Sequence, residues 1–193
     1  MVRNNVMYRT MQSALTTRDG ETNEAPVIEG YFAVFDSDYD MGYGMSESVA
    51  PGAFSETLSG DVRALIDHDT RLVLGRTTAH TLELREDSHG LWGKIYINPK
   101  DSEAMNLYER VKRGDVSQCS FGFEIISEEM SFPAEGKIHW RITKVRLYEV
   151  SCCTYPAYEE TGISARKKDW EQIEKRKSEA WKSTLLKKLK GEK

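Results

Sequence analysis

Short runs in which apolar and polar residues alternate recur along the chain, and they limit the folds that it can adopt. In the run VSQCSFGFEI, residues 116–125, a period of two places Cys119, Phe121 and Phe123 on one face of a strand. Runs of comparable character occupy residues 27–37, 61–69, 80–99 and 137–154. Many strands with few helices predict a mainly β (α+β) fold, a closed or nearly closed antiparallel β-barrel with flanking helices.

Two segments are typical of the flanking helices. Residues 53–60 predict a short helix that ends at Gly60. Residues 101–114 predict a longer one, because Asp101 or Ser102 can cap its start and Gly114 can end it. Its apolar residues have helical spacing: Ala104, Leu107, Tyr108 and Val111.

A chain of 193 residues is long enough for one domain with a substantial core. We expect that domain at residues 26–163, after a loosely ordered segment at 1–25. Residues 164–193 hold 11 basic and 5 acidic side chains and predict a basic helical arm, whereas the rest of the chain has a net charge of −10. An acidic body argues against specific nucleic-acid binding by the domain.

Composition and motifs exclude several other classes of protein. No apolar run approaches the roughly 20 residues of a membrane span, and the start has no signal-peptide core, which predicts a cytoplasmic protein. Cys152 and Cys153 are adjacent and have neither disulfide nor metal-ligand spacing, so we expect the cysteines to be core residues. Phosphate-binding glycine motifs and paired histidines are absent from the sequence, so no cofactor or metal is expected.

Two residues could supply nucleophilic chemistry. The alternation of residues 116–125 directs Ser120 away from the core, beside Gly122, which is either an ordinary sheet surface or the presentation of a nucleophile. His68 follows an apolar strand and lies between Asp67 and Asp69. It is either a histidine held by neighbouring acids at a strand end or the base that activates a serine.

Glu149 could complete such a site. The alternation of residues 145–153 places this carboxylate on an apolar strand face, where it is costly unless it is paired. A carboxylate that orients the histidine would fit, and so would an ion pair with Arg141 or Arg146. Both interpretations stay open at this point.

Several segments together resemble the prohead proteases of tailed phages, which are related in fold to the herpesvirus assemblins. They follow the family order from residue 29 to residue 161: EGYFAVFDS, VAPGAF, VRALIDHD with LVLGRT, LELREDSHGLWGKIYI, RVKRGDVSQCSFGFEI and YEVSCCTYPAYEET. The resemblance implies an assemblin-type fold and a serine endopeptidase. It also implies cleavage of scaffold and capsid-protein extensions, and of the enzyme itself, inside the assembling procapsid in the host cytoplasm.

Carried over by motif, the resemblance implies that His68, Ser120 and Glu149 are the catalytic residues. The chain has DHD where the family often has NHD, and CSFGF where MSFGF is usual. His139 is a less favoured third member, by analogy with the second histidine of assemblins. Arg76 and Gly122 are candidates for substrate or oxyanion contact.

The partners that the resemblance implies are proteins: the major capsid protein, the scaffold and a second copy of the chain in a homodimer. No membrane or specific nucleic-acid partner is expected. The basic arm at residues 164–193 lies outside the quoted segments and would suit removal by self-cleavage, docking to scaffold, or no role. The competing function is a catalytically silent assembly factor that keeps the protease fold, because a fold does not establish an activity.

Overall fold

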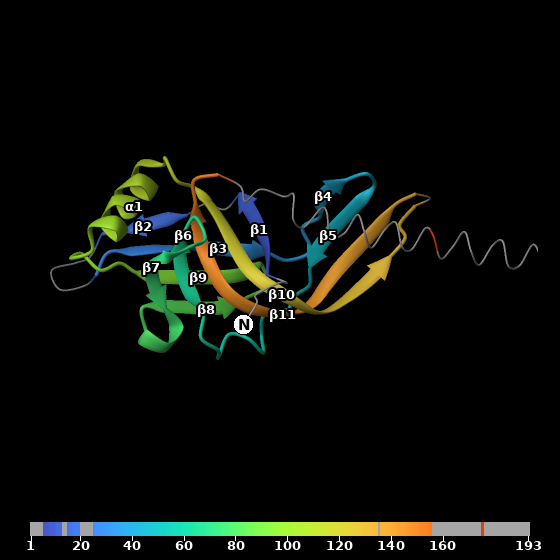
Figure 1. Ribbon diagram of the computed structural model, residues 1–193, viewed down its shortest axis with the longest axis horizontal. Coiled ribbons are helices and arrows are strands. Elements are labelled where there is room, and N and C mark those ends of the chain that lie inside the picture. Colours follow the sequence, from blue (N-terminus) through green and yellow to red (C-terminus); the bar gives the residue numbers. More distant parts are fainter. Residues whose placement is uncertain (1–5, 13–14, 20–24, 135, 156–174, 176–193) are drawn as a thin grey trace, which may run out of the picture. The chain divides into compact units, whose positions relative to one another are not determined.

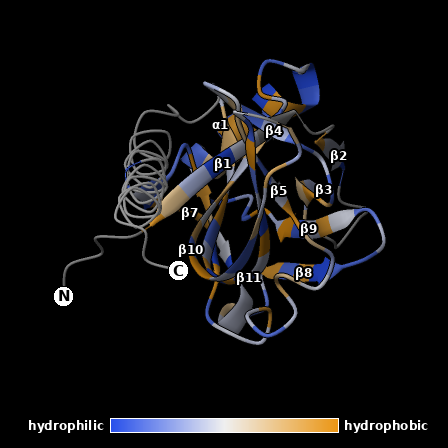
Figure 2. Ribbon diagram, turned by 90° about the vertical axis from the view of Figure 1, so that its right-hand side faces the viewer, coloured by the Kyte–Doolittle hydropathy of each residue, from blue (hydrophilic) through white to orange (hydrophobic). Residues whose placement is uncertain are grey.

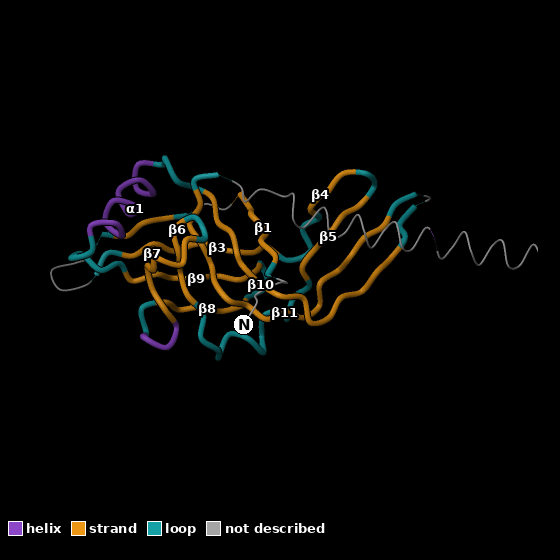
Figure 3. The backbone as a smooth tube through the Cα atoms, viewed as in Figure 1, coloured by secondary structure: helices purple, strands orange, loops and turns teal. Residues whose placement is uncertain are grey.

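The computed structural model describes residues 6–12, 15–19, 25–134, 136–155 and Lys175. Strands make up most of the described chain, as Figure 3 shows, and the helix α1 lies at one end of them. The elements are β1 (Met7–Gln12), β2 (Thr16–Arg18), β3 (Val27–Val34), β4 (Tyr39–Gly42), β5 (Met45–Val49), β6 (Arg63–Ile66), β7 (Asp69–Arg76), the 3₁₀ helix η1 (Thr77–Ala79), β8 (Leu82–Glu86), β9 (Gly90–Tyr96), α1 (Ser102–Arg113), β10 (Gln118–Ser131) and β11 (Ile138–Cys153).

The strands form two sheets. The seven-stranded sheet has the order β1-β10-β11-β5-β4, and β6 joins it by pairing with β11 and β7. The four-stranded sheet has the order β2-β3-β9-β8. In Figure 1 the long β10 and β11 run from the end that carries α1 toward β4 and β5. The mainly β fold is confirmed.

The closed antiparallel barrel is not found among the described residues. β11 pairs in parallel with β5 near its start and with β6 near its end, so the seven-stranded sheet is mixed. Alternation within one segment does not distinguish these arrangements, because it fixes which face a side chain occupies and not which strand lies alongside.

The core lies between the two sheets and under α1. Figure 2 shows hydrophobic residues along β7, β9 and β10. Phe32, Phe54, Phe121 and Phe123 are each at most 1% exposed and belong to one cluster with the buried face of α1. The face of β10 that was expected to be buried therefore does pack into the core.

The helix α1 has the predicted caps. The Asp101 carboxylate accepts hydrogen bonds from the backbone amides of Glu103 and Ala104, and Gly114 ends the helix with a φ of 88°. Its buried residues are the four that the spacing predicted. The prediction of a short helix at residues 53–60 is wrong, because this segment is a series of turns.

The N-terminal segment was expected to be loosely ordered, yet it contains β1 and β2. β1 forms the antiparallel edge of the seven-stranded sheet against β10, more than 100 residues away. A polar segment gives no apolar signal for such a distant pairing, so the sequence did not show it. The predicted arm at residues 164–193 lies outside the described residues, apart from Lys175.

Among the described residues, no helix is long and apolar enough to cross a membrane.

Candidate functional site

His68 lies on the tight turn between β6 and β7. Ile66 pairs with Asp69, which leaves Asp67 and His68 as a two-residue hairpin loop. Both have positive φ, 46° and 61°, as the favoured two-residue hairpin turns require. Asp, Asn and His tolerate this region better than most residues, so the DHD sequence suits the turn as NHD would.

The acids beside His68 do not hold its ring. Asp69 binds Arg71, and the Asp67 carboxylate accepts hydrogen bonds from the backbone amide and hydroxyl of Thr154 at 2.7 and 3.1 Å. The contacts of Asp67 fix the turn to the end of β11. The interpretation in which neighbouring acids hold the imidazole is therefore wrong.

The ring of His68 is instead held by Glu149. His68 Nδ1 lies 2.7 Å from Glu149 Oε1, and the Ser151 hydroxyl donates to Glu149 Oε2 at 2.5 Å. A carboxylate oxygen accepts hydrogen bonds, so the tautomer that satisfies the contact with Glu149 has its proton on Nδ1 and has Nε2 as the basic nitrogen. Ser151 also accepts a hydrogen bond from the His68 backbone amide at 3.2 Å, which ties the turn to the same strand.

Glu149 reaches His68 because β11 carries an extra residue. Phe123 pairs with Leu147 but Gly122 pairs with Glu149, so Tyr148 is unmatched. This bulge leaves Leu147 in the core and turns Glu149 to the opposite face. Simple alternation had put the two side chains on one face.

Gly122 makes room for the Glu149 carboxylate. A Cβ at this position would collide with Glu149 Oε1 and would lie 2.9 Å from Cε1 of Tyr8. Gly122 therefore accommodates the His68–Glu149 pair directly. Its expected contact with substrate stays a prediction.

Ser120 lies on β10, paired with Ser151 of β11 on one side and with Thr10 of β1 on the other. Its hydroxyl donates to the backbone carbonyl of Arg9 at 2.9 Å, and the residue is fully buried. It does point away from the apolar core, but it is not open to solvent, and its hydroxyl is bonded to β1. Within the described residues, the His68 ring makes hydrogen-bonding contacts with Glu149 and Cys153. The Ser120 hydroxyl is therefore not hydrogen-bonded to His68 in this structure.

Three nearby residues were not singled out from the sequence. The ring of Tyr8 packs on that of His68 with centroids 4.4 Å apart. Ser151 orients Glu149, and its place two residues after Glu149 on the same strand was the available signal. Cys153 Sγ lies 3.7 Å from His68 Nε2, but burial raises the pKa of this thiol, which disfavours the nucleophilic thiolate.

The alternative partners of this site are engaged elsewhere. His139 lies between the hydroxyls of Ser46 and Ser48, at 2.8 and 2.9 Å. Arg141 pairs with Asp36, and Arg146 pairs with Glu124. An ion pair of Glu149 with either arginine is thus not formed.

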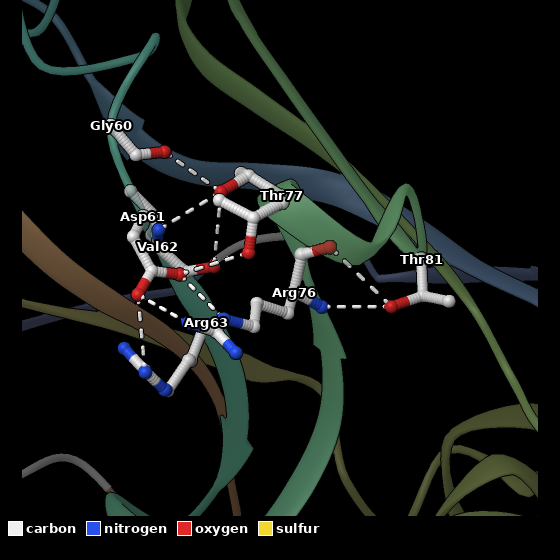
Figure 4. Close-up of polar contacts among 8 residues, drawn as sticks. Gly60, Asp61, Val62, Arg63, Arg76, Thr77 and Thr81 are labelled. Atoms are coloured by element: carbon white, nitrogen blue, oxygen red, sulfur yellow. Dashed lines mark hydrogen bonds and ion pairs between the residues drawn. The ribbon is translucent and has the colours of Figure 1, made fainter.

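Arg76 lies at the far end of β7 from His68. Figure 4 shows its side chain beside Asp61, with Nε and Nη2 at 2.6 and 2.7 Å from the two carboxylate oxygens. Arg63 approaches the same carboxylate at 3.1 Å. These contacts account for Arg76 structurally, and its proposed role toward substrate stays untested.

The Asp61 cluster predicts a pH dependence of stability. The hydrogen bond from Arg76 lowers the pKa of Asp61 from 3.8 to about 2. A carboxyl whose pKa is lower in the folded state stabilises the protein above its unfolded pKa, and this contribution is lost as the pH falls through about 2. We expect the Asp61→Asn variant to lose less unfolding free energy than the wild type between pH 4.5 and pH 2.5 in urea titrations. Equal losses in both proteins would contradict this assignment.

Within the ranges that the structure describes, no group of three or more histidine, cysteine or acidic residues could hold a metal ion.

Comparisons with known proteins identify the family of the chain. Residues 13–176 match the family described as caudovirus prohead serine protease. The prohead protease of Enterobacteria phage HK97 is 32% identical over 158 residues, which cover 78% of this chain and 63% of the relative. The chain thus spans less than two thirds of the length of that relative.

A solved structure supports the fold. The capsid assembly protease gp21 of bacteriophage T4 aligns with a TM-score of 0.53 and 10% sequence identity, over 79% of this chain and 98% of that one. At this identity the likeness concerns the fold alone. The family match covers most of the sequence, including the segments that carry His68, Ser120 and Glu149, and the chain therefore belongs to the caudovirus prohead serine protease family.

Proposed function

We propose that the protein is a serine endopeptidase that cleaves scaffold and capsid-protein extensions during maturation of a phage procapsid. The observation that carries this proposal is the 2.7 Å contact between His68 and Glu149. Glu149 lies on β11, the strand that pairs with the strand of Ser120, and the chain belongs to a serine protease family. Its site of action would be the interior of the procapsid in the host cytoplasm. A homodimer would be the working form, as the resemblance to assemblins implies.

In the proposed mechanism, His68 Nε2 removes the proton of the Ser120 hydroxyl as Ser120 attacks the scissile carbonyl. Glu149 holds the tautomer with the proton on Nδ1 and stabilises the imidazolium that forms. His68 then gives the proton to the leaving amine, and water hydrolyses the acyl-enzyme by the same route. The Ser120 hydroxyl must first leave the Arg9 carbonyl and turn to His68.

The test is mass-spectrometric mapping of a fluorophosphonate adduct on the full chain, with the His68→Ala variant beside it. We expect an adduct on Ser120 that is lost in the variant. The Cys153→Ala variant should label like the wild type. No adduct, even after addition of the phage capsid protein, would favour the silent assembly factor instead.

Gly122→Ala is expected to separate the catalytic arrangement from the fold. The added methyl must displace the Glu149 carboxylate or the Tyr8 ring, so His68 loses its partner geometry. A misplacement of about 1 Å costs roughly 100-fold in rate, and we expect a fall of that order in hydrolysis of the capsid protein.

Gly60→Ala is the matched control, because a Cβ there meets only the Thr57 carbonyl oxygen at 3.0 Å. Thermal unfolding of both variants checks that the fold is kept. Full activity in Gly122→Ala would show that the close approach to Glu149 is irrelevant to the reaction.

A further inference from the structure

β1 occupies the edge of the strand that carries Ser120. It pairs antiparallel with β10, with Tyr8 opposite Gly122, Arg9 opposite Phe121 and Thr10 opposite Ser120. It is an edge strand of the seven-stranded sheet, so without β1 this part of β10 would itself be a sheet edge. Addition of an extended segment to a sheet edge is a common mode of peptide recognition.

The contacts of β1 resemble those that a bound peptide substrate would make in a serine protease. A serine protease requires the carbonyl of the residue before the scissile bond at the nucleophile, and the Arg9 carbonyl lies 2.9 Å from Ser120 Oγ. The preceding residue, Tyr8, packs on the ring of His68. β1 thus contacts both the proposed nucleophile and the proposed base, with Arg9 in the place of the residue before the cleaved bond.

The side chain of Arg9 enters a pocket with an acidic floor. Its Nε and Nη2 lie 2.6 and 3.0 Å from the two carboxylate oxygens of Glu47. The side chains of Arg9 and Glu47 are only 9% and 2% exposed. The guanidinium also lies 5.8 Å from the ring centre of Phe123 and 6.0 Å from that of Tyr39. A two-point pairing of this kind matches the planar fork of arginine.

The pocket that holds the Arg9 side chain has empty space beside it. A cavity of about 300 Å³ adjoins Arg9 and is lined, among others, by Asp38, Tyr39, Glu47 and Val49. A carboxylate as buried as that of Glu47 is strongly destabilising without a cation. With Asp38 on the same cavity, the wall is acidic and apolar, which disfavours an acidic side chain and suits a long basic one.

We propose that Glu47 is the primary specificity residue and that the enzyme cleaves after arginine or lysine, with Arg9 of β1 holding the place of that substrate residue. This inference rests on the proposed function, because it assigns Ser120 as the nucleophile. A substrate strand binds by replacing β1 along β10 and placing its basic side chain on Glu47. The N-terminal strand therefore competes with substrate.

A matched pair of peptidyl diphenyl phosphonates tests the proposal on the full chain. The two probes differ only in the residue that bears the phosphonate, an arginine or a leucine analogue, and adducts on Ser120 are followed by mass spectrometry. We expect labelling by the arginine probe to be at least about tenfold faster, since one buried ion pair discriminates by that much. Arg9→Ala should label faster still with the arginine probe, because it leaves Glu47 for the probe.

Removal of the pocket charge should abolish the preference. Glu47→Gln is expected to bring the two labelling rates within about twofold of each other. Since this change leaves Arg9 buried without its partner, the Arg9→Met/Glu47→Gln double variant gives the same test in a pocket without a buried charge. Thermal unfolding of each variant confirms that folded protein is compared.

The outcomes separate the two proposals. If a small fluorophosphonate labels Ser120 but the arginine and leucine probes react equally, the specificity assignment is overturned and the protease function stands. A preference for the leucine probe, or a preference for arginine that persists in the double variant, overturns it too. If no probe labels Ser120 in any variant, both proposals fail.

Discussion

Ser120→Ala is expected to reduce cleavage of the phage capsid protein by about 10⁴-fold or more. Removal of the nucleophile of a serine protease leaves only the contribution of substrate binding and oxyanion stabilisation. The measurement is the intact mass of the capsid protein after co-expression with each variant. His68→Ala should give a loss of similar size, and the double variant should be little worse than either single one, because the two residues act as a unit.

Ser117→Ala is the matched control. This serine lies three residues earlier in the chain and is exposed, so its loss should leave cleavage unchanged. Capsid cleavage that survives in Ser120→Ala and disappears in Cys153→Ala would move the nucleophile to the thiol beside His68 Nε2. The raised pKa of Cys153 argues against that result.

Phe54→Ala is expected to lower the free energy of unfolding by about 3–5 kcal/mol. The side chain of Phe54 is fully buried, and its ring packs edge-on against Phe121 at 5.5 Å and lies 6.2 Å from Phe35. Truncation removes buried apolar surface and leaves a cavity in the core beneath the site strand. Urea unfolding followed by circular dichroism measures the change.

Tyr155→Ala serves as the control for that experiment, since its side chain is 77% exposed. We expect its effect to stay within about 0.5 kcal/mol. A loss below about 1 kcal/mol for Phe54→Ala would contradict the prediction and would mean that the core collapses around the missing ring.

The sequence pointed to His68, Ser120 and Glu149 as candidate site residues because each of the three carries a local signal. His68 follows an apolar run and lies in a turn between two aspartates. By alternation, Ser120 lies on the face of its strand that Phe121 and Phe123 do not occupy. The link between His68 and Glu149 was one of two interpretations that the residues left open, the resemblance favoured it, and the two side chains do meet. Tyr8 and Cys153 were missed, because nothing in their own neighbourhoods relates them to a histidine 60 or more residues away.

The sequence by itself determined the mainly β character, the caps and buried face of α1, and the family. Periodicity and capping chemistry act over a few residues, and the family follows from the order of the short motifs, so each can be read within a single segment of the sequence. Only the tertiary structure decided that β11 bulges at Tyr148, that β11 pairs in parallel with β5 and β6, and that β1 pairs beside Ser120 with Arg9 bound to Glu47. Each of these depends on register and pairing between distant strands, and alternation within a single strand contains no information about its neighbour.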